Sequence, residues 1–287
     1  MSKNLSIIVP VFNEEDSIEL VLNRLTSDFT DSQIIVVNDG STDATSKILK
    51  SFDKKVEIIT HNSNLGYGAS IKTGIDHSKR TYLSWFDSDG QHKTEDLIKM
   101  INIIKKKKLI AVIGNRLNHF SKFKLLGKLS IRILTSILGY KLERDINCGL
   151  RVIETKFIKK YYEILPDGFS ASLTSTLLLM STNSKFEYMD IEIDSRVGKS
   201  KVKVIDGAIT LGMVIKLSII LSPMKIFFPV GLTFIFIGIT YGTFTAFIKG
   251  LGYPPLSLII INFGLIISLF ALLISHINYF FNMKARK

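Results

Sequence analysis

The chain has 287 residues, of which 46% are hydrophobic and 22% are charged, and its formal net charge is +12. The single cysteine, Cys148, excludes an intramolecular disulfide and a cysteine-based zinc site. The positive charge suits nucleic acid, anionic lipid or phosphorylated substrates, but no nucleic-acid recognition motif or basic aromatic stripe is present, which argues against the first. Charged residues recur up to about residue 205, whereas Lys249 is the only one between residues 226 and 281. One region is therefore suited to water and the other to lipid.

The first part of the chain alternates short apolar runs, typical of buried strands, with segments of helical spacing. The predicted strands cover residues 5–11, 34–37, 56–59, 82–86 and 109–113, and the predicted helices cover 16–25, 44–52, 67–77 and 95–105. Strands separated by helices of this length predict an α/β domain, with a mostly parallel sheet covered by helices on both faces. In such sheets ligands bind beyond the carboxyl ends of the strands.

Two amphipathic stretches follow, at about 121–142 and at 202–222, where Leu and Ile alternate with Lys and Arg. This pattern predicts helices in the membrane interface, although surface helices packed on the sheet remain the alternative. We expect residues 1–201, including the first stretch, to form one domain and the second stretch to be a juxtamembrane helix.

The C-terminal part predicts a membrane hairpin. Residues 226–248 carry no charge, and a helix rising ~1.5 Å per residue over this length spans a hydrocarbon core of ~30 Å. Residues 256–281 predict a second span, and two buried helices of a soluble core are the competing interpretation. Flanking cations outnumber the single loop lysine, which predicts that both chain ends are cytoplasmic. The N-terminus lacks the apolar core of a signal peptide, so we expect the polar domain in the cytosol.

Acidic residues gather after two of the predicted strands. Asp39 follows the second strand, and Asp87 and Asp89 follow the fourth. Two neighbouring carboxylates repel each other unless a cation neutralises them. Oxygen ligands of this kind suit Mg²⁺ or Mn²⁺ bridging to substrate phosphates.

Four segments resemble the family 2 glycosyltransferases of the GT-A fold: Ile8–Glu15 (IVPVFNEE), Asn38–Ser41 (NDGS), Asn64–Ala69 (NLGYGA) and Asp87–His92 (DSDGQH). Within that family the chain is most similar to the dolichyl-phosphate mannose synthase and bacterial polyprenyl-phosphate glycosyltransferase branch. The resemblance implies a Rossmann-like GT-A domain followed by interface helices and a two-helix transmembrane hairpin. It assigns the nucleotide pocket to Pro10, Phe12, Glu14, Val37, Asp39, Asp87 and Ser88, and the metal to Asp89 and Gln91.

Three downstream segments resemble phosphate-binding parts of the same family: Gly114–Arg116, Asp145–Arg151 and Arg196–Lys201. Each carries a guanidinium or ammonium group where the family pattern expects phosphate, and arginine offers a planar fork of donors to phosphate oxygens. The resemblance implies that the diphosphate and the lipid phosphate are held by Arg116, Arg132, Arg196, Lys199 and Lys201, the choice between the two lysines staying open. Asp89, Arg116 and Arg196 are the expected catalytic residues.

Some features allow two interpretations. The glycines at 66 and 68 open a predicted helix and fit either phosphate binding or a turn with close packing. His92 either continues the metal loop or is an exposed residue capping the next helix. The segment 169–176 lacks a glutamate found in relatives, and we expect this region to shape the sugar pocket.

The resemblance implies inverting, metal-dependent transfer of a sugar from a UDP- or GDP-sugar to a polyprenyl phosphate, undecaprenyl or dolichyl, at the cytoplasmic membrane face. The expected partners are therefore the nucleotide sugar, the lipid phosphate and the membrane, with no nucleic acid. A homo-oligomer is compatible with the resemblance but required by no residue. The alternatives are a processive polysaccharide synthase, whose Gln-x-x-Arg-Trp motif is missing because Trp85 is the only tryptophan, and a membrane-tethered nucleotide-binding scaffold without turnover.

Overall fold

The computed structural model describes residues 2–117, 145–168, 170–197, 212, 215–216, 219, 222–250 and 252–284. The described residues up to 197 belong to one compact unit, and those from 212 belong to a second. The two amphipathic stretches predicted at 121–142 and 202–222 lie outside the described residues, apart from isolated positions in the second. The proposed domain boundaries therefore stay predictions.

The first unit contains a single sheet, seven-stranded within the described residues, in the order β3-β2-β1-β4-β6-β5-β7. The strands are β1 (Leu5–Val11), β2 (Gln33–Asn38), β3 (Glu57–Thr60), β4 (Tyr82–Trp85), β5 (Ala111–Arg116), β6 (Arg151–Glu154) and β7 (Phe186–Ile191). β6 is antiparallel to both of its neighbours, and all other pairs are parallel. The predicted mostly parallel α/β sheet is therefore confirmed.

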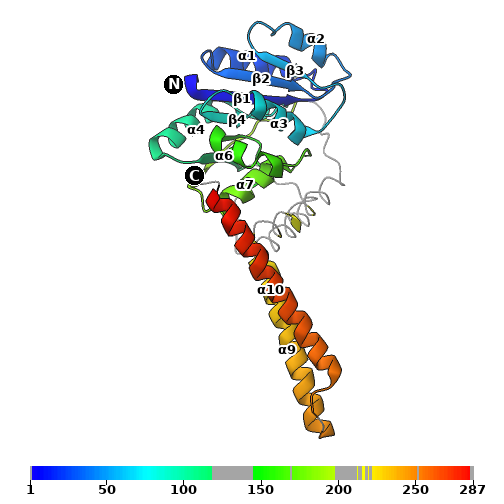
Figure 1. The fold of residues 1–287 in the computed structure, drawn as a ribbon. Coiled ribbons are helices and arrows are strands. Elements are labelled where there is room, and N and C mark those ends of the chain that lie inside the picture. Colours follow the sequence, from blue (N-terminus) through cyan, green and yellow to red (C-terminus); the bar gives the residue numbers. More distant parts are fainter. Residues whose placement is uncertain are drawn as a thin grey trace. The chain divides into compact units, whose positions relative to one another are not determined.

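Helices cover both faces of this sheet (Figure 1). Alternate β1 residues from Leu5 to Val11 share one hydrophobic core with α1 (Ile18–Asp28), α2 (Thr45–Lys50) and α4 (Thr94–Lys107). α3 (Tyr67–His77) contacts β1 and β2, and it also contacts α6 (Thr155–Lys160) and α7 (Ala171–Ser181). Gly74 allows the close approach of α3, since a Cβ there would lie 2.3 Å from Cγ2 of Ile8. Short 3-10 turns occupy Ser2–Asn4 and Tyr162–Ile164.

The predicted elements agree with the observed ones to within three residues at each end. Four elements of the first unit were not predicted, namely β6, β7, α6 and α7. β6 has only four residues, and β7 is an edge strand whose residues are mostly half-buried, so neither carries a clear period of two. In α7 the first nine residues are all buried, which removes the polar face that marks an amphipathic helix.

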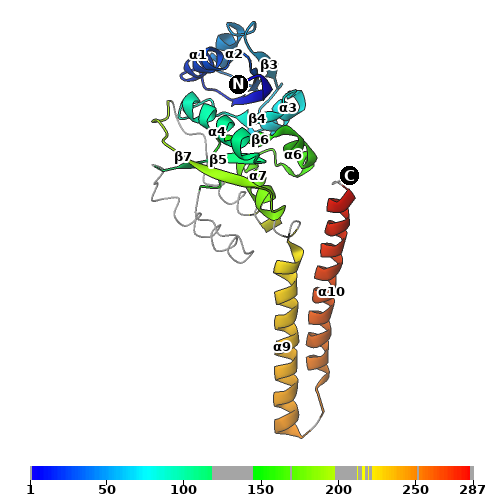
Figure 2. The same cartoon turned by 90° about the vertical axis from the view of Figure 1, so that its left-hand side faces the viewer.

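The second unit contains α9 (Pro223–Lys249) and α10 (Pro255–Lys284), which lie side by side in both views (Figures 1 and 2). Both are long and apolar enough to cross a membrane, with mean hydropathies of 1.7 and 2.7 in their most apolar windows. Only 17% and 22% of these windows are buried, which argues against the competing interpretation of buried helices in a soluble core. The predicted spans 226–248 and 256–281 lie inside these helices.

Glycines allow the two helices to approach closely. A Cβ on Gly231 would lie 2.7 Å from the carbonyl oxygen of Gly264, and a Cβ on Gly264 would lie 2.6 Å from that of Gly231. Gly238 meets the backbone of α10 in the same way, 3.0 Å from the carbonyl oxygen of Ser257. Small residues at helix contacts are typical of membrane helices, where packing rather than the hydrophobic effect drives association.

Candidate functional site

The loops that follow β1 and β2 are joined to each other at the carboxyl edge of the sheet. Asn13 adopts a left-handed backbone conformation with φ of 52°, and its side-chain oxygen accepts a hydrogen bond of 2.7 Å from the Thr42 amide. The Glu14 amide donates to the Thr45 hydroxyl at 2.9 Å, and the Ala44 amide donates to the Glu15 carboxylate at 2.7 Å. These bonds hold the two loops in one position relative to each other.

The Asp39 carboxylate, predicted to contact the nucleoside, is buried and engaged with the chain itself. It accepts hydrogen bonds of 2.8 Å from the amides of Leu65 and Gly66 and lies 2.7 Å from Nδ1 of His61. Asp39 therefore fixes the start of α3, where its negative charge also suits the helix N-terminus. Its role as a nucleoside ligand stays a prediction.

The two glycines at the start of α3 serve close packing. A Cβ on Gly66 would lie 2.5 Å from the carbonyl oxygen of Asp167, and a Cβ on Gly68 would lie 2.0 Å from that of Pro166. Gly66 also has φ of 108°, which L side chains rarely adopt. The Ala69 amide donates to the Asp167 carbonyl at 3.0 Å. The structure thus favours the packing interpretation of this motif over the phosphate-binding one.

The Asp-x-Asp motif follows β4 and is tied to α1 by the Ser17 hydroxyl, which donates to the Ser88 carbonyl at 2.7 Å. Asp87 accepts hydrogen bonds from the Tyr67 hydroxyl at 2.7 Å and from Nε2 of His92 at 3.3 Å. Asp89 is 9% exposed. The Asp89 carboxylate caps its own loop, because Oδ1 accepts a 3.2 Å hydrogen bond from the Gln91 amide.

The two acids have opposite pKa shifts. Burial opposes the charge of Asp87, but donation by His92 and Tyr67 and the charge of Arg116 together lower the pKa of Asp87. Burial and the nearby charge of Asp87 raise the pKa of Asp89. The charged form of Asp89 is thus less favoured than that of Asp87, although the charge of Arg196 partly offsets the effect of burial. A cation bound at Asp89 would favour its charged form further.

Segment 194–197 runs along the Asp-x-Asp loop and brings Arg196 to it. The Val197 amide donates to the Asp89 carbonyl at 3.2 Å, and the Asp194 amide donates to the Gln91 carbonyl at 3.0 Å. Nη2 of Arg196 donates to Oε1 of Glu14 at 2.8 Å, while Nη1 lies 3.4 Å from Oδ2 of Asp89. Arg196 therefore bridges the β1 loop and the predicted metal ligand, although 182 residues separate it from Glu14.

Arg116 stands at the end of β5 and is paired with an acid. Its Nε donates to Oδ2 of Asp145 at 2.5 Å, and the Asp145 amide donates to Oδ1 of Asn115 at 3.0 Å. Although burial opposes its charge, the Asp145 carboxylate raises the pKa of Arg116. The guanidinium stays charged, and its Nη atoms are the part that could meet a phosphate.

The arginine of the Asp145–Arg151 segment, expected to meet phosphate, is buried instead, so that expectation is wrong. Arg151 is 0% exposed, and its guanidinium donates to the carbonyls of Cys148 and Ser172 and to the hydroxyls of Ser175 and Thr176. It also lies over the Trp85 ring, 5.1 Å from the ring centroid. Burial lowers the pKa of Arg151. Arg151 therefore holds α7 on the sheet and does not face a ligand.

The other predicted residues are placed as follows. Pro10 and Val37 are paired neighbours in β1 and β2, and because Val37 is 0% exposed it supports the site from inside the sheet. Phe12 is half-buried at the end of β1. His92 is 4% exposed and packs edge-on against Phe86, so the exposed-cap interpretation is wrong. Arg132, Lys199 and Lys201 lie outside the described residues.

The residues present fit a divalent cation that is shared with a substrate. Within the described ranges, no three of His, Cys, Asp and Glu converge into a closed metal cage. Mg²⁺ and similar cations need only one or two protein oxygens when phosphates supply others. Nε2 of Gln91 donates to the Asp194 carbonyl at 3.4 Å, which leaves the amide oxygen to accompany the Asp89 carboxylate. An oxygen pair of this kind suits Mg²⁺ or Mn²⁺.

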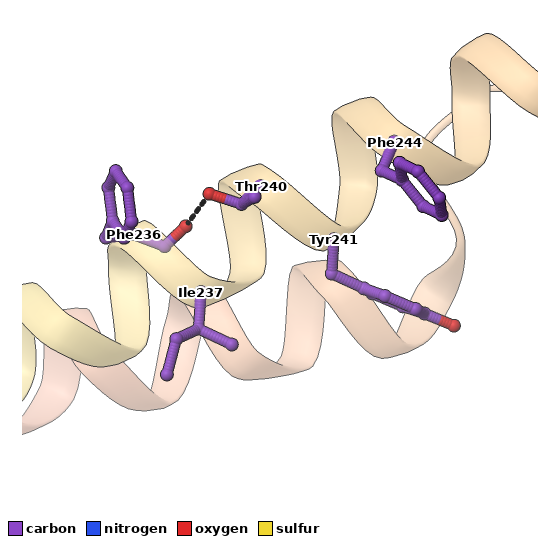
Figure 3. A pocket seen from close by; sticks show the side chains of 5 residues that line it. All are labelled: Phe236, Ile237, Thr240, Tyr241 and Phe244. Atoms are coloured by element: carbon purple, nitrogen blue, oxygen red, sulfur yellow. Dashed lines mark hydrogen bonds between the residues drawn. The ribbon is translucent and has the colours of Figure 1, made fainter.

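A separate apolar hollow on α9 offers no comparable chemistry. Phe236, Ile237, Thr240, Tyr241 and Phe244 line it (Figure 3). The Thr240 hydroxyl donates back to the Phe236 carbonyl at 2.8 Å. This surface is suited to contact with lipid.

Sequence reasoning missed several residues that shape the site, notably Asn13, Ser17, His61 and Tyr67. Asn13 and Tyr67 stand inside the quoted motifs, and that position was the available signal. His61 follows β3 directly and precedes the quoted Asn64–Ala69 motif, and its Nδ1 lies 2.7 Å from Asp39. Nothing in its local sequence distinguishes Ser17 from an ordinary helix-start serine.

Comparisons with known proteins give the families that this chain matches. A family model described as Glycosyl transferase family 2 matches residues 6–161, and one described as GtrB C-terminal hairpin matches residues 222–278. A UDP-N-acetylglucosamine–dolichyl-phosphate N-acetylglucosaminyltransferase of Methanococcus voltae is 30% identical over 208 residues, which cover 63% of this chain and 81% of that protein. A dolichyl-phosphate beta-glucosyltransferase of Trichomonas vaginalis is 26% identical over 255 residues, or 78% of this chain and 72% of that protein.

Among solved structures, glucosyl-3-phosphoglycerate synthase of Mycobacterium tuberculosis, in complex with Mn²⁺, uridine diphosphate and phosphoglyceric acid, has a TM-score of 0.58. The match covers 75% of this chain and 77% of that chain at 15% identity, so it is a likeness of fold.

Proposed function

Because this chain belongs to glycosyl transferase family 2, we propose that it transfers a sugar from a nucleoside diphosphate sugar to a polyprenyl phosphate at a membrane surface. The observation that carries the proposal is the clustering of Asp87, Asp89 and Arg196 at the carboxyl edge of the sheet, in a chain that also has two candidate membrane helices. Relatives named for transfer to dolichyl phosphate support the acceptor class.

The donor would bind over the loops that follow β1, β2 and β4. Phe12 and Glu14 with Asp39 are proposed to hold the nucleoside, and Asp87 with Ser88 the ribose and diphosphate. Asp89 and Gln91 would hold Mg²⁺ or Mn²⁺, a proposal that the Mn²⁺ and uridine diphosphate bound to a protein of the same fold support. When bound, the cation would neutralise charge on the departing diphosphate.

The acceptor would be an anionic phosphate ester. Arg116 and Arg196 are the described arginines that interact with the acidic loop, since the charge of Arg116 lowers the pKa of Asp87 and Arg196 contacts Asp89. Together with Arg132, Lys199 and Lys201, they are proposed to hold the diphosphate and the lipid phosphate. A guanidinium stays protonated, so it suits a ligand that must remain anionic.

The proposed reaction is a single displacement at the anomeric carbon. A phosphate oxygen of the lipid forms the new bond to that carbon, and the bond to the nucleoside diphosphate breaks with its electron pair leaving on the diphosphate oxygen. No proton has to be removed from the nucleophile, so no general base is assigned. The protein residues contribute orientation and charge stabilisation of the leaving group. One displacement inverts the anomeric centre.

We further propose that α9 and α10 cross the membrane as a hairpin, with the polar unit and both chain ends on the cytoplasmic side. The distribution of flanking cations supports this topology. A Lys3→Cys substitution in a Cys148→Ala background tests it in sealed inverted membrane vesicles. If the N-terminus is cytoplasmic, a membrane-impermeant thiol reagent should label the cysteine at position 3 in intact inverted vesicles. Labelling that requires detergent would contradict the topology.

The deciding experiment measures nucleoside diphosphate release by the full chain in detergent. UDP- and GDP-sugars are tested with polyprenyl phosphate and with Mg²⁺ or Mn²⁺. We expect release that requires both lipid phosphate and metal, and a fall of about 100-fold or more in Asp89→Ala. Asp53→Ala is the matched control, because Asp53 is an exposed carboxylate in a turn after α2.

Two outcomes would contradict the proposal. Metal-dependent release that ignores the lipid phosphate would remove the acceptor assignment. A product in which the anomeric configuration of the donor is retained would remove the single displacement.

A further inference from the structure

Three separate parts of the chain surround the Asp87 carboxylate. The Tyr67 hydroxyl, on the first residue of α3, donates to Oδ1 at 2.7 Å, and His92 in the metal loop lies 3.3 Å from Oδ2. On a third side a Cβ on Gly149 would lie 2.1 Å from Oδ2, so the carboxylate packs directly against that glycine. Asp87 is therefore held in a single orientation.

The Tyr67 contact is the shorter of the two hydrogen bonds and comes from a firmly placed side chain. The start of α3 is fixed from one side by the Asp39 carboxylate, which accepts from the amides of Leu65 and Gly66. It is fixed from the other side by the Asp167 carbonyl, which accepts from the Ala69 amide. Tyr67 lies between these anchors, so its position is set by residues that do not themselves contact Asp87.

Tyr67 remains a hydrogen-bond donor at neutral pH. Burial, followed by the charge of Asp87, raises the pKa of Tyr67 well above its ordinary value, so the hydroxyl keeps its proton. Asp39 and Asp87 are both assigned to the nucleotide, and Tyr67 links the helix start that Asp39 holds to the carboxylate of Asp87.

We propose that Tyr67 is a positioning residue for donor binding, whose hydroxyl holds the Asp87 carboxylate in the orientation that meets the nucleoside diphosphate. The inference rests on the proposed function and adds a residue to it. Tyr67 acts through Asp87 and does not touch the reacting atoms. Losing its hydroxyl should therefore weaken donor binding much more than it lowers kcat, the turnover rate of the bound complex.

The chain provides a matched control for this test. The Tyr162 hydroxyl donates to Oδ2 of Asp76 at 2.6 Å, and Asp76 lies near the other end of the same helix, α3. Tyr67→Phe and Tyr162→Phe thus each remove one tyrosine–aspartate hydrogen bond anchored on α3. Only the first bond involves the Asp-x-Asp motif.

The experiment titrates UDP and GDP, each with Mn²⁺, into the full chain in detergent by calorimetry, and measures donor KM and kcat with polyprenyl phosphate. For Tyr67→Phe we expect about five- to ten-fold weaker nucleotide binding and a matching rise in KM, with kcat within about twofold of wild type. Tyr162→Phe should bind within about twofold of wild type. Adding Tyr67→Phe to Asp87→Asn should weaken binding by less than about twofold further, because the two changes remove one interaction.

The proposal is overturned if Tyr67→Phe and Tyr162→Phe bind nucleotide with the same affinity. It is also overturned if Tyr67→Phe lowers kcat and leaves KM unchanged, because a smaller fraction of folded protein gives that result. Equal losses from Tyr67→Phe in the wild-type and Asp87→Asn backgrounds would also overturn it. Failure of the wild-type chain to bind either nucleotide is a different result, because it overturns the proposed function and this inference with it.

Discussion

Arg196 and Asp89 form an ion pair at the predicted metal position, with Nη1 of the arginine 3.4 Å from Oδ2 of the aspartate. The same guanidinium is anchored on Glu14 through a 2.8 Å hydrogen bond. The protein thus supplies a positive charge beside Asp89 itself. A metal ion that binds Asp89 has to compete with this guanidinium, which would then be available to a phosphate.

The first prediction concerns Arg196→Gln. Removing the competing cation should strengthen Mn²⁺ binding to the nucleotide-free chain about two- to five-fold, the range expected for a partly exposed ion pair. Nucleoside diphosphate release should fall by about 100-fold, because the leaving group loses a charged donor. Electron paramagnetic resonance of free Mn²⁺ measures the first effect.

Lys93→Gln is the control for this change, because Lys93 pairs with Asp194 in the same segment at 3.5 Å. It should leave Mn²⁺ affinity within about twofold of wild type. Equal Mn²⁺ affinity in wild type and Arg196→Gln would show that the ion pair does not compete with metal.

The second prediction concerns Gly149→Ala. The added Cβ would lie 2.1 Å from Oδ2 of Asp87, so the carboxylate has to move. We expect nucleotide affinity to fall by about tenfold or more, in line with losses from disturbing groups that orient a ligand site. Gly168→Ala is the control, since no described atom lies within 4 Å of its Cβ position. Calorimetric titration compares the two, and unchanged affinity in Gly149→Ala would contradict the tight packing around Asp87.

The third prediction concerns Arg151→Lys. Four acceptors surround the buried guanidinium, two of them 2.6 Å away, and an ammonium group cannot reach them all in the same geometry. We expect the substitution to destabilise the polar unit by about 3 kcal/mol, which lowers its Tm by roughly 5–10 °C. Arg80→Lys changes an exposed arginine and should leave the Tm unchanged. Thermal unfolding in detergent tests both variants. Equal Tm values for wild type and Arg151→Lys would rule out a structural role for Arg151.

The fourth prediction concerns pH. Burial raises the pKa of Cys148 to about 12, whereas an unfolded cysteine ionises near ~8.5. Because the folded-state pKa is the higher one, the contribution of the protonated Cys148 thiol to the free energy of unfolding is fully present below pH ~8.5. This contribution is lost as the pH rises towards the folded value, because the thiol ionises in the unfolded chain first. The Tm of wild type should therefore fall relative to that of Cys148→Ala as the pH rises from 8 to 10.5.

A thiol reagent gives an independent check on Cys148. At pH 8 the native chain should react slowly and the urea-unfolded chain rapidly, because only the thiolate reacts. Rapid labelling of the native chain, together with a Tm difference that does not change with pH, would contradict the buried, protonated thiol.

Much of the fold could be predicted from local pattern. The buried runs of β1 and β2, the helical spacing of α1 and α4 and the two apolar helices all carry their periods in consecutive residues, so each element is visible without knowledge of its neighbours. β6 and β7 were not visible, because a short strand and a half-buried edge strand gain their stability from partners far along the chain. The acids at strand ends were found because parallel strands bring their carboxyl ends to one edge.

Local sequence pattern therefore suffices for the fold class, the apolar hairpin and the positions of Asp39, Asp87 and Asp89. The partners of these acids depend on tertiary contacts. Arg196 reaches Asp89 across 107 positions of the chain and Tyr67 reaches Asp87 across 20, while Arg151 turned inward under α7 instead of towards a phosphate. The physical reason is that hydrogen bonds and ion pairs act over a few ångströms in space, whereas the periodicity of a sequence reports only on neighbours within the same helix or strand.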